Sequence, residues 1–122
     1  MIKIRYIVHD VEKAVEFYTS NLGFELLKQY GPAVAILERD GVELIVSGPM
    51  ASASQPMPDG TIPEPGGWAR FQIVVDDIEA EVARLKQNGV EFKHDIIESQ
   101  GRKQTICLDP SGNIVELFQE PA

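Results

Sequence analysis

Alternating hydrophobic and polar residues open the chain, and the same pattern returns past its middle. Residues 2–8 (Ile-Lys-Ile-Arg-Tyr-Ile-Val) and 68–75 (Trp-Ala-Arg-Phe-Gln-Ile-Val-Val) have the two-residue period of a half-buried strand. Each run leads into an aspartate, Asp10 or Asp77, of the type that caps a helix N-terminus. The pattern therefore predicts a strand followed by a helix in each half of the chain.

Apolar residues at helical spacing follow each aspartate and predict helices over 10–22 and 77–88. The two stripes are Val11, Ala14, Val15, Tyr18 and Leu22, and then Ile78, Val82 and Leu85. Gly23 and Gly89 come where a left-handed residue often ends a helix.

Further strands are expected at 24–29, 33–38 and 42–47, and again at 90–97, 103–108 and 113–119. Turn residues at 39–41 and 109–112 separate the last two strands of each set. Moving the first half by 67 positions places Asp10 on Asp77, so the order of elements repeats. The expected fold class is α+β, built from two βαβββ modules with curved, mostly antiparallel sheets around a cavity.

A proline-rich segment separates the modules. We expect one domain over 1–122, with module one at about 1–48, a linker at about 49–66 and module two at about 67–122. Five prolines between Gly48 and Gly67 exclude a regular helix or a central strand there. The segment is interpreted as a stiff connector, with a lid over a ligand or a swap hinge as the alternatives.

The charge and composition of the chain limit the classes of molecule that it is expected to bind. The formal net charge is −8, which argues against nucleic-acid binding and against adhesion to anionic membranes. No apolar run has the roughly 18 residues of a membrane helix, and the strand-like start at Ile2 leaves no room for a signal peptide. The expected location is the cytoplasm.

Several motifs resemble those of the vicinal oxygen chelate superfamily, which includes glyoxalase I, bleomycin-resistance proteins and extradiol dioxygenases. They are Phe17-Tyr18, Leu22-Gly23-Phe24 and the closing segment 109–117 (Asp-Pro-Ser-Gly-Asn-Ile-Val-Glu-Leu). The resemblance implies the glyoxalase-like fold, a small organic ligand and a homodimer. The fold hosts many chemistries, so the resemblance alone does not give an activity.

The resemblance also implies where metal ligands would stand in metal-dependent relatives. These positions are on the first strand of each module, here Lys3 and Arg70, and on the last strand, here Glu43 and Glu116. A protonated lysine or an arginine has no lone pair for a metal. We therefore expect no cofactor; a divalent metal on Glu43 and Glu116, completed by water or substrate oxygens, is the alternative.

Strand alternation indicates which side chains line the expected cavity. These residues share the sheet face turned away from the helices, or open the second module: Lys3, Arg5, Glu43, Ser47, Trp68, Arg70, Gln72, Glu116 and Phe118. Two interpretations stay open, an ion-pair network that only seals the fold and a polar anchor for an anionic ligand. Trp68 is placed at the mouth of the cavity, with core packing as its default interpretation. Cys107, on an apolar strand, is interpreted as a buried structural thiol rather than a nucleophile.

The favoured function is metal-independent binding of a small organic molecule, anionic or antibiotic-like. The alternatives are a divalent-metal lyase, isomerase or dioxygenase, and a structural or partner-binding domain without a ligand. Whether the chain is an enzyme is left open; as an enzyme it would be a glyoxalase-like lyase or a dioxygenase.

Overall fold

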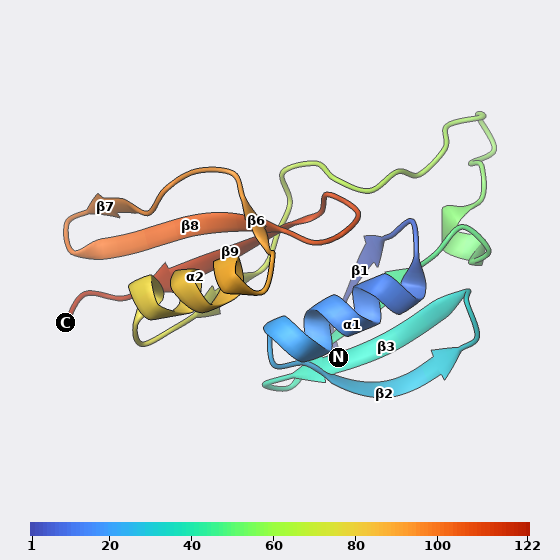
Figure 1. Ribbon diagram of the computed structural model, residues 1–122. Coiled ribbons are helices and arrows are strands. Elements are labelled where there is room, and N and C mark those ends of the chain that lie inside the picture. Colours follow the sequence, from blue (N-terminus) through green and yellow to red (C-terminus); the bar gives the residue numbers. More distant parts are fainter. The chain divides into compact units, whose positions relative to one another are not determined.

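The chain forms two units, each with one helix and one mixed β-sheet (Figure 1). The computed structural model describes all residues from 1 to 122. Unit 1 comprises residues 1–66 and 110–113, and unit 2 comprises 67–109 and 114–122. The predicted α+β class is confirmed, and the two sheets are not closed into a barrel.

Unit 1 follows the predicted order of elements closely. Its elements are β1 (Lys3–Ile7), α1 (Val11–Asn21), β2 (Glu25–Tyr30), β3 (Val34–Arg39) and β4 (Val42–Ser47). The sheet has the order β1-β4-β3-β2, with β1 parallel to β4 and the other neighbours antiparallel. The proline-rich segment contains one short 3-10 turn, Ser52–Ser54, and no strand.

Unit 2 repeats the order with shorter strands. Its elements are β5 (Gln72–Val74), α2 (Ile78–Gln87), β6 (Glu91–Phe92), β7 (Ile97–Ser99), β8 (Arg102–Leu108) and β9 (Ile114–Gln119). The sheet order is β5-β9-β8-β6, and β7 also pairs with β8. As in unit 1, the first and last strands are parallel.

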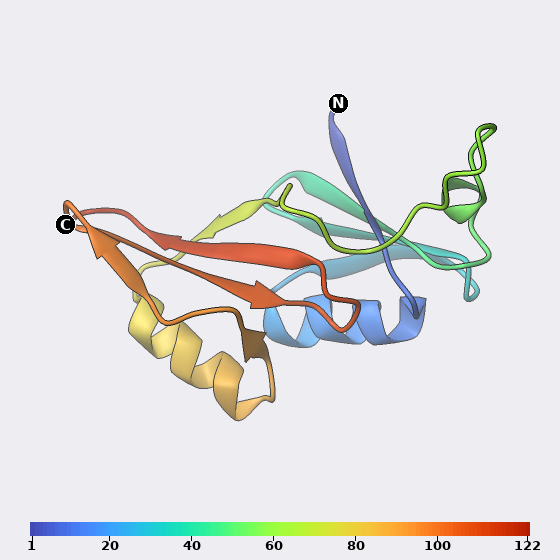
Figure 2. The ribbon, with the colours of Figure 1, turned by 90° about the horizontal axis from the view of Figure 1, so that it is seen from above.

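Both helices begin and end as the sequence predicts. The carboxylates of Asp10 and Asp77 each accept a hydrogen bond from a backbone N–H three residues later, at 3.1 Å. Gly23 and Gly89 follow the helices with φ of 69° and 83°. Helix α1 packs on β2, β3 and β4, and α2 lies on one side of β8 and β9 and contacts β9 (Figure 2). One face of each sheet is thereby buried, and the other face is left for polar side chains.

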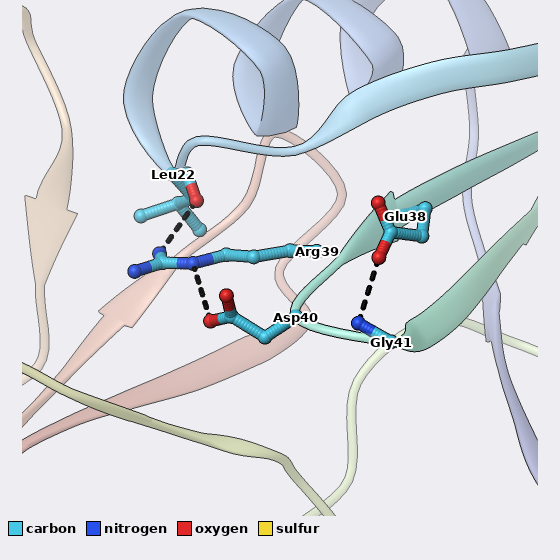
Figure 3. Close-up of polar contacts among 5 residues, drawn as sticks. All are labelled: Leu22, Glu38, Arg39, Asp40 and Gly41. Atoms are coloured by element: carbon cyan, nitrogen blue, oxygen red, sulfur yellow. Dashed lines mark hydrogen bonds and ion pairs between the residues drawn. The ribbon is translucent and has the colours of Figure 1, made fainter.

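The β3–β4 turn is tied to the end of α1 (Figure 3). Asp40 and Gly41 both have positive φ, as a two-residue hairpin turn requires. Arg39 donates from Nη1 to the carbonyl of Leu22 at 2.7 Å, which satisfies a carbonyl at the helix C-terminus. Glu38 accepts the backbone N–H of Gly41 at 2.7 Å, so its carboxylate is engaged in the turn.

The predicted strand over 68–75 is wrong in its first half. Only Gln72–Val74 is strand, because the neighbouring strand β9 begins at Ile114 and offers no partner to residues before 70. Gly66 and Gly67, with φ of 107° and 89°, turn the chain just before this point.

The predicted strand over 90–97 is interrupted. The backbone N–H of Lys93 bonds to Ile106, whereas Ile97 pairs with Gln104, so two extra residues are looped out between the two pairings. The carbonyl of His94 accepts instead from the hydroxyl of Thr105 at 2.9 Å. A side-chain hydrogen bond thus replaces a ladder bond at the interruption.

Candidate functional site

Each unit presents a row of polar side chains on the sheet face opposite its helix. On β1 the residues Ile4 and Tyr6 are more buried than Lys3 and Arg5, which agrees with the predicted alternation. On β5, Ile73 is buried while Gln72 and Val74 are exposed. The structure thus gathers the predicted site residues into two clusters, one in unit 1 and one in unit 2.

The cluster of unit 1 is open to solvent. Lys3 Nζ lies 3.3 Å from Glu43 Oε1, and 45% of the lysine side chain is exposed. Arg5 donates from Nη1 to the hydroxyl of the buried Ser47 at 2.7 Å. This guanidinium has no carboxylate partner, so the cluster holds one partly exposed ion pair, Lys3–Glu43, and one arginine bound only to a hydroxyl.

The cluster of unit 2 surrounds a buried carboxylate. The side chain of Glu116 is 9% exposed and accepts two hydrogen bonds, one on each oxygen. Arg70 Nε donates to Oε1 at 2.9 Å, and Gln72 Nε2 donates to Oε2 at 2.6 Å. Both donors help to satisfy a charge that burial would otherwise make costly. Phe118, the remaining predicted residue of this strand, is half-buried.

The two glutamates are not equivalent, which corrects the sequence alignment. The backbone N–H groups of Val8 and Val75, each two residues before the helix cap, bond to the carbonyls of Ser47 and Phe118. Ser47 therefore corresponds to Phe118, and Glu43 corresponds to Ile114 rather than to Glu116. In agreement, Glu43 pairs with Lys3, whereas Glu116 pairs with Gln72. The similar sequences around the two glutamates hid this two-residue shift.

These residues do not fit a metal held at the four positions implied by the resemblance. Lys3 and Arg70 are hydrogen-bond donors without a lone pair, and each engages the carboxylate beside it. The structure contains no group of three or more His, Cys, Asp or Glu side chains that could hold a metal ion.

The assignment of Trp68 to the core is wrong. Its side chain is 69% exposed, and Lys93 Nζ lies 5.3 Å from the centroid of its ring. The carbonyl of Trp68 also accepts from Arg70 Nη1 at 3.2 Å. Lys93 was not among the predicted site residues, because its approach to Trp68 depends on the bend after β6.

Cys107 is buried, as the apolar strand predicts. Burial raises the pKa of its thiol from 9.0 to about 12. At neutral pH the group is a neutral thiol facing the side of the sheet that α2 covers, and it has no part in the polar cluster.

Asn113 has a structural role that sequence reasoning missed. Its side chain donates to the carbonyl of Ile7 and accepts the N–H of Gly66, both at 2.8 Å. Next to it, the hydroxyl of Ser111 accepts the N–H of His9 at 2.8 Å. The closing motif therefore fixes the end of β1 and of the proline-rich segment within unit 1.

The fold described above agrees with the protein family whose model matches this chain. The Glyoxalase/Bleomycin resistance protein/Dioxygenase superfamily matches residues 2–117. The chain belongs to this superfamily, as the sequence motifs indicated.

Several solved structures share the fold. Lactoylglutathione lyase from Agrobacterium tumefaciens superposes with a TM-score of 0.75 and 19% identity, over 98% of this chain and 92% of that one. The fosfomycin resistance protein FosX from Listeria monocytogenes has a TM-score of 0.75 and 16% identity, with the same coverages of 98% and 92%. A superfamily member from Sphaerobacter thermophilus has a TM-score of 0.73 and 26% identity, covering 98% of each chain.

Among curated proteins, none matches this chain. Neither helix has the length and apolar character needed to cross a membrane.

Proposed function

We propose that this chain binds a small organic anion without using a divalent metal. The observation that carries the proposal is the occupation of the two first-strand positions by cations, Lys3 and Arg70, each engaged with a glutamate. At each of these positions a metal would find a positive charge in place of a ligand with a lone pair. A carboxylate, phosphate or phosphonate would instead find hydrogen-bond donors.

The two clusters contribute differently to this proposal. Arg70 is held by Glu116, and its side chain is still 31% exposed, which leaves room for an incoming anion. Arg5 in unit 1 has no acidic partner and needs no ion pair to be broken before it binds a ligand. We propose Arg5 as an anion contact in unit 1 and Arg70 as an anion contact in unit 2. Ser47 orients Arg5, and Glu116, which also accepts from Gln72, orients Arg70.

The names of the structural relatives supply probes. Lactoylglutathione carries carboxylates, and fosfomycin is a phosphonate, so both are organic anions. They are tested together with simple aromatic and aliphatic carboxylates by thermal shift and by isothermal titration calorimetry. Saturation at 100 times Kd would add about 2.7 kcal/mol to the free energy of unfolding.

The control variants separate site binding from general charge effects. Arg70→Gln and Arg5→Gln should each weaken anion binding, whereas Arg84→Gln, which removes an arginine paired with Glu81 on α2, should not. Stoichiometric uptake of Ni²⁺ or Mn²⁺ with lyase or dioxygenase activity would favour the metal-dependent alternative. Absence of any anion binding would favour a structural or partner-binding domain.

We also propose a homodimer. Each sheet ends in strands with a free edge, β1 and β2 in unit 1 and β5 and β6 in unit 2, and such edges are commonly covered by another chain. Light scattering at micromolar concentration should give twice the 13.5 kDa mass of one chain. A mass of one chain would contradict this.

A further inference from the structure

The exposed indole of Trp68 is the starting observation. It is the only tryptophan in the chain and remains 69% exposed, although burial of an indole is among the larger gains available to a side chain. Lys93 contacts one face of the ring, with Nζ 5.3 Å from the centroid. An accessible aromatic surface therefore lies directly beside a cation.

The sheet register brings these residues to one face of unit 2. The N–H of Lys93 bonds to Ile106, which pairs with Glu116, which in turn pairs with Gln72. Paired residues project from the same face of a sheet. Lys93 follows β6, at one edge of the order β5-β9-β8-β6, and Trp68 precedes β5, at the other edge. The two side chains thus meet across a face about 14 Å wide, given strands about 4.8 Å apart.

The charges in reach of Trp68 favour an anion. Arg70 uses Nε for Glu116 and Nη1 for the carbonyl of Trp68, while Nη2 has no partner. Glu116 already accepts on both oxygens. Glu91 lies on the same face, in the row of Leu108 and Ile114, and forms no ion pair with Arg70 or Lys93. Both charged side chains that contact Trp68 are therefore cations, in a chain whose net charge is −8.

We propose that this face of unit 2 binds an aromatic carboxylate, with its ring stacked on the face of the Trp68 indole opposite Lys93 and its carboxylate held by Arg70 Nη2. The positive charge of Lys93, behind the indole, adds to the attraction for the anion. The inference rests on the proposed anion binding and narrows its ligand class. An indole offers a flat apolar surface to a second ring, and a guanidinium edge matches a carboxylate better than an ammonium alone does. An aliphatic anion would use only the second of these features.

The single tryptophan makes the test specific. One indole N–H signal is expected in the nitrogen-15 NMR spectrum, and 2-naphthoate is titrated while this signal is followed. Cyclohexanecarboxylate controls for charge without an aromatic ring, and 2-naphthalenemethanol controls for the ring without charge. We expect saturable movement of the indole signal with 2-naphthoate and at least threefold weaker binding of both controls.

Two variants and a matched control test the residues. Lys93→Gln should weaken 2-naphthoate binding about twofold to fivefold, the usual worth of one exposed charge–charge interaction. Lys86→Gln is the control, since Lys86 lies 5.7 Å from the ring of Phe92 in the same kind of contact, and it should change nothing. Trp68→Leu, followed by calorimetry, should make 2-naphthoate bind no better than cyclohexanecarboxylate.

The outcomes distinguish the two proposals. If both carboxylates bind equally and neither Lys93→Gln nor Trp68→Leu matters, the aromatic site is refuted while anion binding stands. If no organic anion binds by calorimetry, the proposed function fails and this inference fails with it. Preferential binding of 2-naphthoate that depends on Trp68 and Lys93 but not on Lys86 supports the site.

Discussion

The polar faces of the two units are built from the same elements but hold their charges differently. Unit 1 pairs Glu43, whose side chain is 17% exposed, with Lys3, whose side chain is 45% exposed. Unit 2 buries Glu116 further, to 9% exposure, and gives it two donors, Arg70, which is 31% exposed, and Gln72. The two-residue difference in register between β4 and β9 causes this contrast. Glu43 pairs with Lys3, whereas Glu116 pairs with Gln72, which corresponds to Arg5 rather than to Lys3.

The contrast shows that a repeated motif does not guarantee a repeated site. The exposed pair in unit 1 is screened by water and contributes little to stability. The buried carboxylate in unit 2 depends on its donors, since an unpaired charge there would be costly. Unit 2 is thus the part in which the loss of one polar side chain has the larger consequence.

The largest expected effect is on the rate at which thiol reagents label Cys107 of unit 2, the only cysteine in the chain. With its pKa raised from 9.0 to about 12, the thiolate fraction at pH 8 falls roughly a thousandfold, and thiol reagents should label the folded protein correspondingly slowly. Labelling in denaturant should be fast. Rapid labelling without denaturant would mean that the helix-covered face of this sheet opens readily.

The same thiol gives a pH dependence with a definite sign. The folded state keeps the proton to a higher pH than the unfolded state, so its contribution is complete below pH 9 and is lost as the pH rises toward 12. The wild type should therefore lose more stability over this range than Cys107→Ala. The free energy of unfolding of both proteins is measured with urea at pH 8 and at pH 10.5. An equal decrease for the wild type and for Cys107→Ala would contradict the burial of the thiol.

The next largest expected effect is the difference in stability lost when Arg70 or Lys3 is replaced by alanine. Arg70→Ala should cost about 3 kcal/mol of unfolding free energy, the lower end for a buried pair, since Gln72 still donates to Glu116. Lys3→Ala should cost less than about 1 kcal/mol. Replacing Glu116 by Leu in the Arg70→Ala background should recover part of the loss, because no buried charge is left. Equal costs at Lys3 and Arg70 in urea unfolding would remove the distinction between the units.

The position after the last paired residue offers a smaller test of the register. Gly48 in unit 1 corresponds to Gln119 in unit 2. A Cβ at Gly48 would lie 2.8 Å from Val11 Cγ2 and 3.0 Å from the carbonyl oxygen of Pro32. Gly48→Ala should therefore cost about 2 kcal/mol through overpacking.

Gln119 contacts the start of α2 through a hydrogen bond, whereas Gly48 packs against the start of α1. Its side-chain oxygen accepts the N–H of Ile78 at 2.8 Å, so Gln119→Ala should cost about 1 kcal/mol, the worth of one hydrogen bond. The melting temperatures of Gly48→Ala and Gln119→Ala, compared with that of the wild type, test both predictions. A neutral Gly48→Ala would show that α1 does not pack as closely on β4 as the register implies.

Much of the fold was predictable because local signals agreed with each other. The caps at Asp10 and Asp77, the apolar stripes and the glycines after the helices all marked the same boundaries, and unit 1 strands fell within one residue of their predicted limits. Nine site residues were expected on the basis of alternation, and the clusters around Glu43 and Glu116 formed as pairs.

What the sequence could not provide depends on pairing between distant strands. The bulge after Lys93 and the lack of a partner strand for residues before 70 arise from register, which carries no local signal. Aligning the two glutamates by the residues next to them therefore missed the two-residue shift in register between β4 and β9. The default interpretation of Trp68 as a core residue failed because its exposed position also depends on these pairings.

The central proposal is that Lys3 and Arg70 leave this chain without two of the metal ligands that the superfamily resemblance implies. It is tested most directly by titrating Ni²⁺ and Mn²⁺ calorimetrically into the wild type and into a variant with Lys3→His and Arg70→His, after circular dichroism has shown both to be folded. The substitutions place a neutral imidazole beside each glutamate. The account predicts no saturable binding by the wild type and a clear gain by the variant. A wild type that takes up one equivalent of metal, and loses it on Glu43→Gln or Glu116→Gln, would contradict the claim.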